Sequence, residues 1–282
     1  MIVEQGEFQG FPALLIDTAL ASAAISLHGG QLLSYVPRGF DDLLWLSPLS
    51  KRAPEAIRGG VPVCWPYFAR QDQAADAPQH GFARNTLWAL VDARIDAQGE
   101  ATVELALPRQ AGSLRLTQTL CIGRQLQQSL TTHNHGQAPV AFTQALHTYF
   151  RVGDAERVQV TGLEGLHYTD RYDGQTHAQA GPWNLQDPRD AGRSDRTYQD
   201  TGSRFLLSDP ALERRIELST AGSRSLVVWN PGATGIAAIG DAPAESWRHF
   251  VCLEAANAGP DVIRLAPGQT HTLRQSVEAL KA

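Results

Sequence analysis

The chain has few lysines, few cysteines and no long apolar run, and each shortage excludes a class of protein. Lys51 and Lys281 are the only lysines among 24 basic residues, and the formal net charge is -5. No basic stripe is present, so nucleic acid is not expected as a partner. A transmembrane helix needs about 18 or more consecutive apolar residues, and no such run occurs. Residues 1–7 lack the basic and then apolar pattern of a signal peptide. The sequence therefore predicts a cytoplasmic protein that binds neither nucleic acid nor membrane.

The three cysteines, Cys64, Cys121 and Cys252, each lie in apolar or strand-like sequence. An odd number without metal-ligand spacing predicts reduced, buried thiols. Cys64 has no activating base near it in the sequence, which argues against a nucleophilic role. His133 and His135 would share one face of a strand, as metal ligands can. No acidic or cysteine partner follows at a suitable spacing, so we expect no metal.

Short segments of alternating polar and apolar residues dominate the chain and predict β-strands. The clearest are residues 23–36, which are broken by two glycines, and residues 101–107, 113–122 and 125–135. The turn at residues 123–124 predicts that the last two segments form a hairpin. Further short strands are expected at 158–160, 215–218, 226–229 and 250–254. Long helical periodicity is scarce, with at most a short turn near residues 241–247.

Many short strands with polar turns between them predict an all-β sandwich or barrel. With 282 residues and 43% hydrophobic content, the chain can form one large β-domain or two ordinary ones. No linker divides it, so we expect a single domain over residues 1–282. Residues 167–201 are rich in Gly, Pro and Asp. They are interpreted as long connections, which are often functional in compact domains.

Residues 56–68 combine a cation, two glycines and an aromatic segment. Arg58 precedes Gly59 and Gly60, which have no side chains and let the backbone approach a ligand closely. Trp65 opens a Trp-Pro-Tyr-Phe sequence, and aromatic faces suit either sugar C–H surfaces or a protein core. We expect Arg58 to contact a ligand, whereas Trp65 by itself is better explained as a core residue. Lys51 is a further cation near Arg58.

Residues 78–85, Pro-Gln-His-Gly-Phe-Ala-Arg-Asn, carry the strongest indication of a binding site. Gln79, His80 and Arg84 bring an amide, an imidazole and a guanidinium together in apolar surroundings. That mixture suits a pocket for a small polar or anionic ligand. Arg84 could form a bidentate, charge-assisted pair with a phosphate or carboxylate. The open alternative is a salt bridge to a neighbouring acid.

Two residues could carry proton-transfer chemistry. His147 lies in an apolar segment beside Tyr149 and Phe150, and a lone histidine there is usually a satisfied core residue. Glu254 ends an apolar strand, where a carboxylate is costly unless it is paired, exposed or functional. Burial would raise the pKa of Glu254 toward a value useful for a general base. Exposure at the strand end is the alternative for Glu254.

Five motifs occur in order at residues 57–66, 78–85, 146–150, 228–231 and 251–254. They read Ile-Arg-Gly-Gly-Val-Pro-Val-Cys-Trp-Pro, Pro-Gln-His-Gly-Phe-Ala-Arg-Asn, Leu-His-Thr-Tyr-Phe, Val-Trp-Asn-Pro and Val-Cys-Leu-Glu. This set resembles the glucose-6-phosphate 1-epimerases, also called hexose-6-phosphate mutarotases. They are a branch of the aldose 1-epimerase (galactose mutarotase-like) superfamily. The likeness runs from about Ile25 to Leu265, and the first two motifs are characteristic of the phosphosugar branch.

The resemblance implies an all-β fold, a large antiparallel β-supersandwich with an open sugar cleft. It implies that His147 is the general acid and Glu254 the general base of an anomer interconversion. Asp195 resembles an aspartate that contacts the sugar, and His80 is a reasonable partner for a sugar hydroxyl. The remaining residues that match ligand-contacting positions of the family are Arg58, Gln79 and Arg84.

One departure from the family pattern lies shortly before Glu254. The family often carries Phe-Gly-Asp-Asp there, whereas residues 239–242 read Ile-Gly-Asp-Ala. Asp241 is retained but the second acid is absent, so Asp241 is left out of the expected site.

The expected function is the interconversion of the α and β anomers of glucose 6-phosphate by a monomer, without a cofactor or metal. Two alternatives stay open. One is an epimerase for unphosphorylated aldoses, which would share His147 and Glu254 but would not need two arginines in the cleft. The other is a sugar-binding or sensing protein on the same scaffold.

Overall fold

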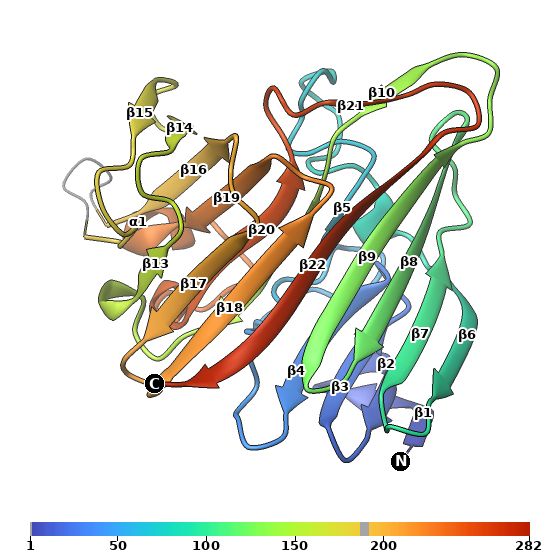
Figure 1. The fold of residues 1–282 in the computed structure, drawn as a ribbon, viewed down its shortest axis with the longest axis horizontal. Helices are drawn as coiled ribbons and strands as arrows, with labels where there is room; N and C mark the ends of the chain where they lie inside the picture. Colours follow the sequence, from blue (N-terminus) through green and yellow to red (C-terminus); the bar gives the residue numbers. More distant parts are fainter. Residues whose placement is uncertain (1, 187–191) are drawn as a thin grey trace.

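The computed structural model describes residues 2–186 and 192–282, which form mainly antiparallel β-strands (Figure 1). Every segment predicted to be a strand contains one, so the all-β prediction is confirmed. The described helices are short: α1 (Gly232–Ile236) and the 3-10 turns η1 (Ala83–Asn85), η2 (Ala155–Arg157) and η3 (Ser246–His249). None of the helices in this part of the chain is long and apolar enough to cross a membrane.

One eight-stranded sheet, called the β9 sheet below, extends across the width of the molecule (Figure 1). Its strands, in spatial order, are β13 (Gln159–Thr161), β17 (Arg204–Asp209), β18 (Arg214–Ala221), β22 (Thr270–Lys281), β9 (Gln125–Asn134), β8 (Leu114–Ile122), β7 (Ala101–Ala106) and β6 (Ala89–Ile95). The predicted hairpin is present, since β8 and β9 pair from Leu114↔Asn134 to Ile122↔Leu126.

Two further sheets and a short ribbon complete the fold. The β20 sheet contains β15 (Thr176–Ala178), β14 (His167–Asp170), β16 (Ser194–Gln199), β19 (Ser225–Asn230), β20 (Phe250–Asn257), β11 (Gln144–Leu146) and β5 (Val63–Cys64), with β12 (Tyr149–Arg151) also paired to β20. The N-terminal sheet contains β1 (Ile2–Phe8), β2 (Phe11–Asp17), β3 (Ala21–Ser26) and β4 (Gln31–Pro37). The ribbon pairs β10 (Val140–Phe142) with β21 (Ile263–Leu265).

The core lies between the β9 sheet and the other two sheets. Alternate residues of β8 and β9 are buried, as expected for strands that present one face to a core. One continuous cluster joins Leu130 of β9, Leu253 of β20 and Ile25 of β3, all fully buried. Each such side chain contributes about 1.5–3 kcal/mol on burial. This arrangement confirms the β-supersandwich, while the division of the chain into one domain over residues 1–282 stays a prediction.

Residues 167–201 differ from the prediction of long connections. They contain β14, β15 and β16, which extend the β20 sheet at one edge. Their strands were missed because turn-forming Gly, Pro and Asp residues interrupt the short alternating segments. Part of the segment, residues 187–191, falls outside the description. The short turn expected near residues 241–247 corresponds to η3, whereas α1 was not predicted.

A chain of hydrogen-bonded side chains crosses the core. Thr148 Oγ1 donates to Gln275 Oε1 at 2.8 Å, Gln275 Nε2 to Gln128 Oε1 at 2.9 Å, and Gln128 Nε2 to Gln118 Oε1 at 2.8 Å. Gln118 Nε2 then donates to the Gly30 carbonyl at 2.6 Å. Buried amides are tolerated when they are paired in this way. These hydrogen bonds connect the β9 sheet to Thr148, which lies between β11 and β12.

Gly60 is required for close backbone packing next to Arg58. Its φ is +60°, and a Cβ there would lie 2.2 Å from the carbonyl oxygen of Leu32. Its N–H donates to Trp45 O at 2.7 Å, and its carbonyl accepts from Tyr149 N at 2.9 Å. A glycine is therefore needed both for the positive φ and for the contact.

We expect Gly60→Ala to lower the free energy of unfolding by at least about 1 kcal/mol more than Gly112→Ala. Gly112 is a matched control because its φ is +59° and nothing lies within 4 Å of the place that a Cβ would take. Urea unfolding of both variants measures the difference. Equal losses would show that the Leu32 contact does not restrict position 60.

Candidate active site

A cavity of about 200 Å³ opens on the face of the β20 sheet that points away from the core. The alternation of β20 explains this placement, because Val251, Leu253 and Ala255 join the core cluster while Glu254 lines the cavity. A second cavity of about 270 Å³ shares part of the same wall. The shared lining residues are Arg58, Gln79, Arg84, His147 and Tyr149.

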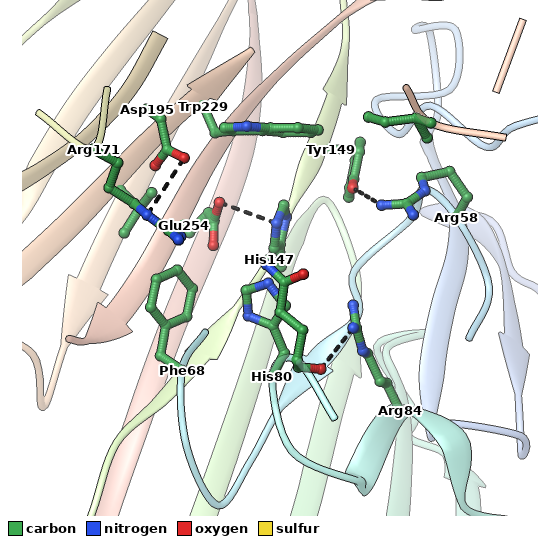
Figure 2. A pocket seen from close by; sticks show the side chains of 13 residues that line it. Arg58, Phe68, His80, Arg84, His147, Tyr149, Arg171, Asp195, Trp229 and Glu254 are labelled. Atoms are coloured by element: carbon green, nitrogen blue, oxygen red, sulfur yellow. Dashed lines mark hydrogen bonds and ion pairs between the residues drawn. The ribbon is translucent and has the colours of Figure 1, made fainter. Parts of the chain in front are cut away.

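His147 and Glu254 face each other across neighbouring strands. Leu146 of β11 pairs with Ala255 of β20, and Tyr149 of β12 pairs with Cys252. The two short strands keep the same register, which puts His147 directly opposite Glu254. Figure 2 shows the resulting contact, 3.3 Å between His147 Nε2 and Glu254 Oε1. His147 thus lies between β11 and β12 rather than inside a strand, and Glu254 lies within β20 rather than at its end.

The surroundings raise the pKa of Glu254 and lower the pKa of His147. Burial, and then the charge of Asp195, raise the pKa of Glu254 well above its usual range, although Arg171 opposes this. Burial, followed by Arg84 and Arg58, lowers the pKa of His147 to about 3. Both shifts favour the neutral forms. The electrostatics of the cavity thus favour a protonated carboxyl facing a neutral imidazole.

Two guanidinium groups lie on the His147 side of the cavity (Figure 2). Arg58 Nε pairs with Asp241 Oδ1 at 3.0 Å, and its Nη1 donates to Tyr149 Oη at 3.1 Å. Arg84 Nη2 donates to the Gln79 carbonyl at 2.7 Å. The buried Nε of Arg84 has no hydrogen-bond partner among the described residues. Arg84 also forms no ion pair with any Asp or Glu side chain in the part of the chain that the structure describes.

His80 reaches the cavity from a loop that follows Trp65. The backbone at His80 is left-handed, with φ of 65°, and its carbonyl accepts from Trp65 N at 3.2 Å. His80 Nδ1 accepts from the backbone N–H of Ala69 at 3.2 Å. The ring proton is therefore on Nε2 when the imidazole is neutral. Burial, reinforced by Arg84, keeps it neutral because it lowers the pKa of His80 well below the usual range.

Asp195 lies on the Glu254 side of the cavity. It belongs to β16, opposite Trp229 of β19, and its Oδ2 is 3.8 Å from Arg171 Nε. Burial raises the pKa of Asp195 to about 6, although Arg171 opposes the shift. A carboxyl in this position can accept hydrogen bonds from a polar ligand near neutral pH.

The structure brings all the residues predicted for the site into one cavity. They are Arg58, Gln79, His80, Arg84, His147, Asp195 and Glu254. Their roles in ligand binding and proton transfer stay predictions. The open alternative for Glu254, exposure at a strand end, is wrong, because its side chain is 1% exposed.

Several lining residues were not predicted. Tyr149, Trp229 and Phe68 form the aromatic walls, and Arg171 adds a third guanidinium. Tyr149 and Trp229 lie in the motifs at residues 146–150 and 228–231, so the family resemblance could have indicated them as lining residues. Asp241, left out of the expected site, contacts Arg58.

His147, Cys252 and Glu254 place nitrogen, sulfur and oxygen donors within 4.8 Å of one another. Zinc takes such donors. Burial raises the pKa of the Cys252 thiol well above its usual range, which disfavours the thiolate that a metal binds. Arg58 and Arg84 also oppose a further cation. We therefore assign no metal to this group.

The histidines considered as metal ligands have other partners. His133 Nδ1 lies 3.1 Å from Thr270 Oγ1, and His135 Nε2 lies 3.0 Å from Gln110 Oε1. Cys64 is fully buried, and burial raises the pKa of its thiol, which agrees with a non-nucleophilic role. Of the three free thiols, Cys64 and Cys252 are buried as predicted, while Cys121 is only half-buried.

The fold and cavity define the galactose mutarotase-like class. A solved structure described as a "putative mutarotase" from Salmonella typhimurium superposes with a TM-score of 0.90 at 28% identity, covering 100% of this chain and 94% of that one. A solved structure of a galactose mutarotase-like protein from Clostridium acetobutylicum shares the fold, with a TM-score of 0.73 at 12% identity over 100% of this chain and 99% of that one.

The chain belongs to the aldose 1-epimerase family, whose sequence model matches residues 12–278. A relative from Escherichia coli K12 named "Putative glucose-6-phosphate 1-epimerase" is 33% identical over 277 residues, which covers 95% of this chain and 90% of that protein. A relative from Salmonella typhimurium with the same name is 31% identical over 91% of this chain and 87% of that protein. The protein is thus an epimerase of the mutarotase type.

We expect Asp195→Asn to stabilise the protein at pH 7.5. The native carboxyl has a pKa of about 6 against an ordinary 3.8, so the folded protein binds more protons and stability falls as the pH rises between these values. The gain is up to about 3 kcal/mol at pH 7.5 and vanishes below pH 4. Urea unfolding at pH 4 and 7.5 measures it.

Asp173→Asn is the matched control of opposite sign. A hydrogen bond from Gln175 N, and then His177, lower the pKa of Asp173, so this carboxylate stabilises the fold above its ordinary pKa and its loss weakens the protein at pH 7.5. An Asp195→Asn protein no more stable than wild type at pH 7.5 would contradict the assigned shift.

Proposed function

We propose that this epimerase is a hexose-6-phosphate mutarotase that interconverts the α and β anomers of glucose 6-phosphate. The observation that carries the proposal is the facing pair His147 and Glu254 beside two guanidinium groups in one cavity. The pair suits proton transfer at the anomeric centre, and Arg58 and Arg84 suit a phosphate. The names of the Escherichia coli and Salmonella relatives support the phosphosugar assignment.

Ring opening needs one base and one acid. The Glu254 carboxylate removes the proton from the C1 hydroxyl while the electron pair of the C1–O5 bond moves to O5. The His147 imidazolium donates its proton to O5, which gives the open-chain aldehyde. Rotation about C1–C2 then presents the other carbonyl face, and the reverse transfers close the ring and restore both groups. Each well-placed group contributes about 10²–10⁴-fold, and neither step draws on a cofactor.

The rest of the cavity holds the sugar while C1 rotates. Arg58 and Arg84 give charge-assisted hydrogen bonds to the 6-phosphate, which keeps the ring in position. Asp195 accepts from a sugar hydroxyl, and His80 donates from Nε2. The Gln79 side chain is exposed at the cavity wall and completes the contacts. Trp229 and Phe68 supply apolar faces for sugar C–H groups.

Two other functions share this scaffold. An epimerase for unphosphorylated aldoses would use the same proton-transfer pair, and the Arg58–Asp241 ion pair would then be purely structural. A sugar-binding protein would hold the phosphosugar without exchange above the buffer rate. A monomeric state and a cytoplasmic location remain part of the proposal.

We expect His147→Ala and Glu254→Gln each to lower kcat/KM for glucose 6-phosphate anomerisation by about 10²–10⁴-fold. Exchange-type NMR of the two anomeric protons measures the rate. Matched controls are His177→Ala and Glu245→Gln, which change a half-buried and an exposed side chain outside the cavity. Unchanged exchange rates in His147→Ala and Glu254→Gln would contradict the assignment of these residues as general acid and general base.

Arg84→Ala is expected to weaken glucose 6-phosphate turnover at least about tenfold more than any glucose turnover, because a charged hydrogen bond is worth about 1.5–3 kcal/mol. Arg109→Ala is the control, since Arg109 stacks on Phe82 of the same segment without lining the cavity. Equal losses for both sugars would favour the unphosphorylated substrate.

A further inference from the structure

The two members of the proton-transfer pair have different electrostatic neighbours. Arg58 and Arg84 act on His147, whereas Asp195 and Arg171 act on Glu254. Figure 2 shows this division, with Asp195 and Arg171 beside Glu254 and both other arginines beyond His147. A charge added near Arg58 and Arg84 therefore acts mainly on the imidazole.

The surroundings of the pair oppose the proton distribution that the proposed reaction needs. Burial favours a protonated Glu254 and a neutral His147, and Arg84 and Arg58 add to the effect on His147, but ring opening as proposed starts from a carboxylate and an imidazolium. The two states contain the same number of protons. They differ only by transfer of one proton over the 3.3 Å between Glu254 Oε1 and His147 Nε2.

We propose that the phosphate dianion of the substrate, held between Arg58 and Arg84, drives this proton from Glu254 to His147 and so activates the enzyme. The inference rests on the proposed function. In this proposal the phosphate contributes to catalysis as well as to binding. It switches on the acid and the base together, and its effect appears in the rate of ring opening as well as in affinity.

The geometry of the cation cluster fits a dianion. Asp241 neutralises part of the charge of Arg58, while Arg84 has no carboxylate partner among the described residues and a buried, unpaired Nε. Lys51 lines the adjoining cavity together with both arginines. Arg58 and Arg84 repel a positive charge on His147. A dianion bound between them offsets their charge and attracts the His147 imidazolium.

The coupling path from the arginines to His147 is short, and it leads from the half-buried Arg58 to the buried Tyr149 and His147. Arg58 donates to Tyr149 Oη, and the Tyr149 ring stacks on His147 with centroids 4.9 Å apart and 13° between the planes. His80 lies edge-on to His147 at 5.6 Å, and burial, reinforced by Arg84, lowers its pKa. Burial raises the pKa of the neighbouring thiols Cys252 and Cys64, which favours their protonated forms. Charges act more strongly over such distances between buried groups than in bulk water.

The direct test separates the sugar from its dianion. D-Xylose has the ring of glucose without C6, so xylose plus inorganic sulfate supplies the two parts of glucose 6-phosphate as separate molecules. Sulfate is too weak a base to catalyse mutarotation in solution, and sodium chloride at equal ionic strength controls for screening. Anomerisation of xylose is followed by polarimetry with and without each salt.

We expect sulfate to raise kcat/KM for xylose saturably and at least about tenfold in the wild type, because each unit of pKa gained by His147 raises its protonated fraction about tenfold. Arg84→Ala should abolish the activation, and Arg84→Lys, which keeps the charge, should retain part of it. Arg171→Gln removes a cation on the Glu254 side and should keep the ratio of activated to basal rate.

The outcomes are distinguishable. If the wild type does not accelerate glucose 6-phosphate anomerisation, the proposed function itself is wrong. If it does, but sulfate competes with glucose 6-phosphate without changing the xylose rate, phosphate serves only binding and the activation is refuted. Sulfate that neither competes nor activates would show that no separate dianion site exists, which also overturns the inference.

Discussion

The direct opposition of His147 and Glu254 across β20 is the constraint on which the rest of the site depends. It follows from one antiparallel register that β11 and β12 share with β20. Thr148, the residue after His147, donates a hydrogen bond to Gln275 in β22 of the β9 sheet. Gln275 is in turn held by the paired amides of Gln128 and Gln118. A slip of one residue would turn Glu254 toward the core and separate the pair.

The site retains polar atoms that the fold leaves unpaired. His147 Nδ1, Glu254 Oε2 and Arg84 Nε are buried without hydrogen-bond partners among the described residues. Such atoms cost stability and need an explanation. A phosphosugar would supply partners for those that face the cavity. The burial of Asp195 and Glu254 is also unfavourable, because it raises the pKa of both carboxyls, and such shifted carboxyls are common at functional sites.

The sequence predicted more of the strands than of their arrangement. Alternation over residues 101–135 was enough to predict β7, β8 and β9, because their buried face is repeated every second residue. It could not predict that residue 147 lies opposite residue 254, since register between distant strands depends on the assembled sheet. Asp241 was left out because the family's second acid is absent beside it, and nothing in the sequence indicated its contact with Arg58, 183 positions away. Motif resemblance, rather than periodicity, brought the seven expected site residues together.

The central claim concerns where one proton lies, and nitrogen NMR of His147 observes it most directly. The ligand 1,5-anhydroglucitol 6-phosphate has no C1 hydroxyl and cannot open, and 1,5-anhydroglucitol is the same molecule without the phosphate. With ¹⁵N-histidine protein, assigned through His147→Ala, we predict a neutral imidazole in the free protein and with 1,5-anhydroglucitol, and an imidazolium with the phosphorylated ligand. An imidazole that stays neutral in the phosphorylated complex, or is already charged in the free protein, would contradict the account.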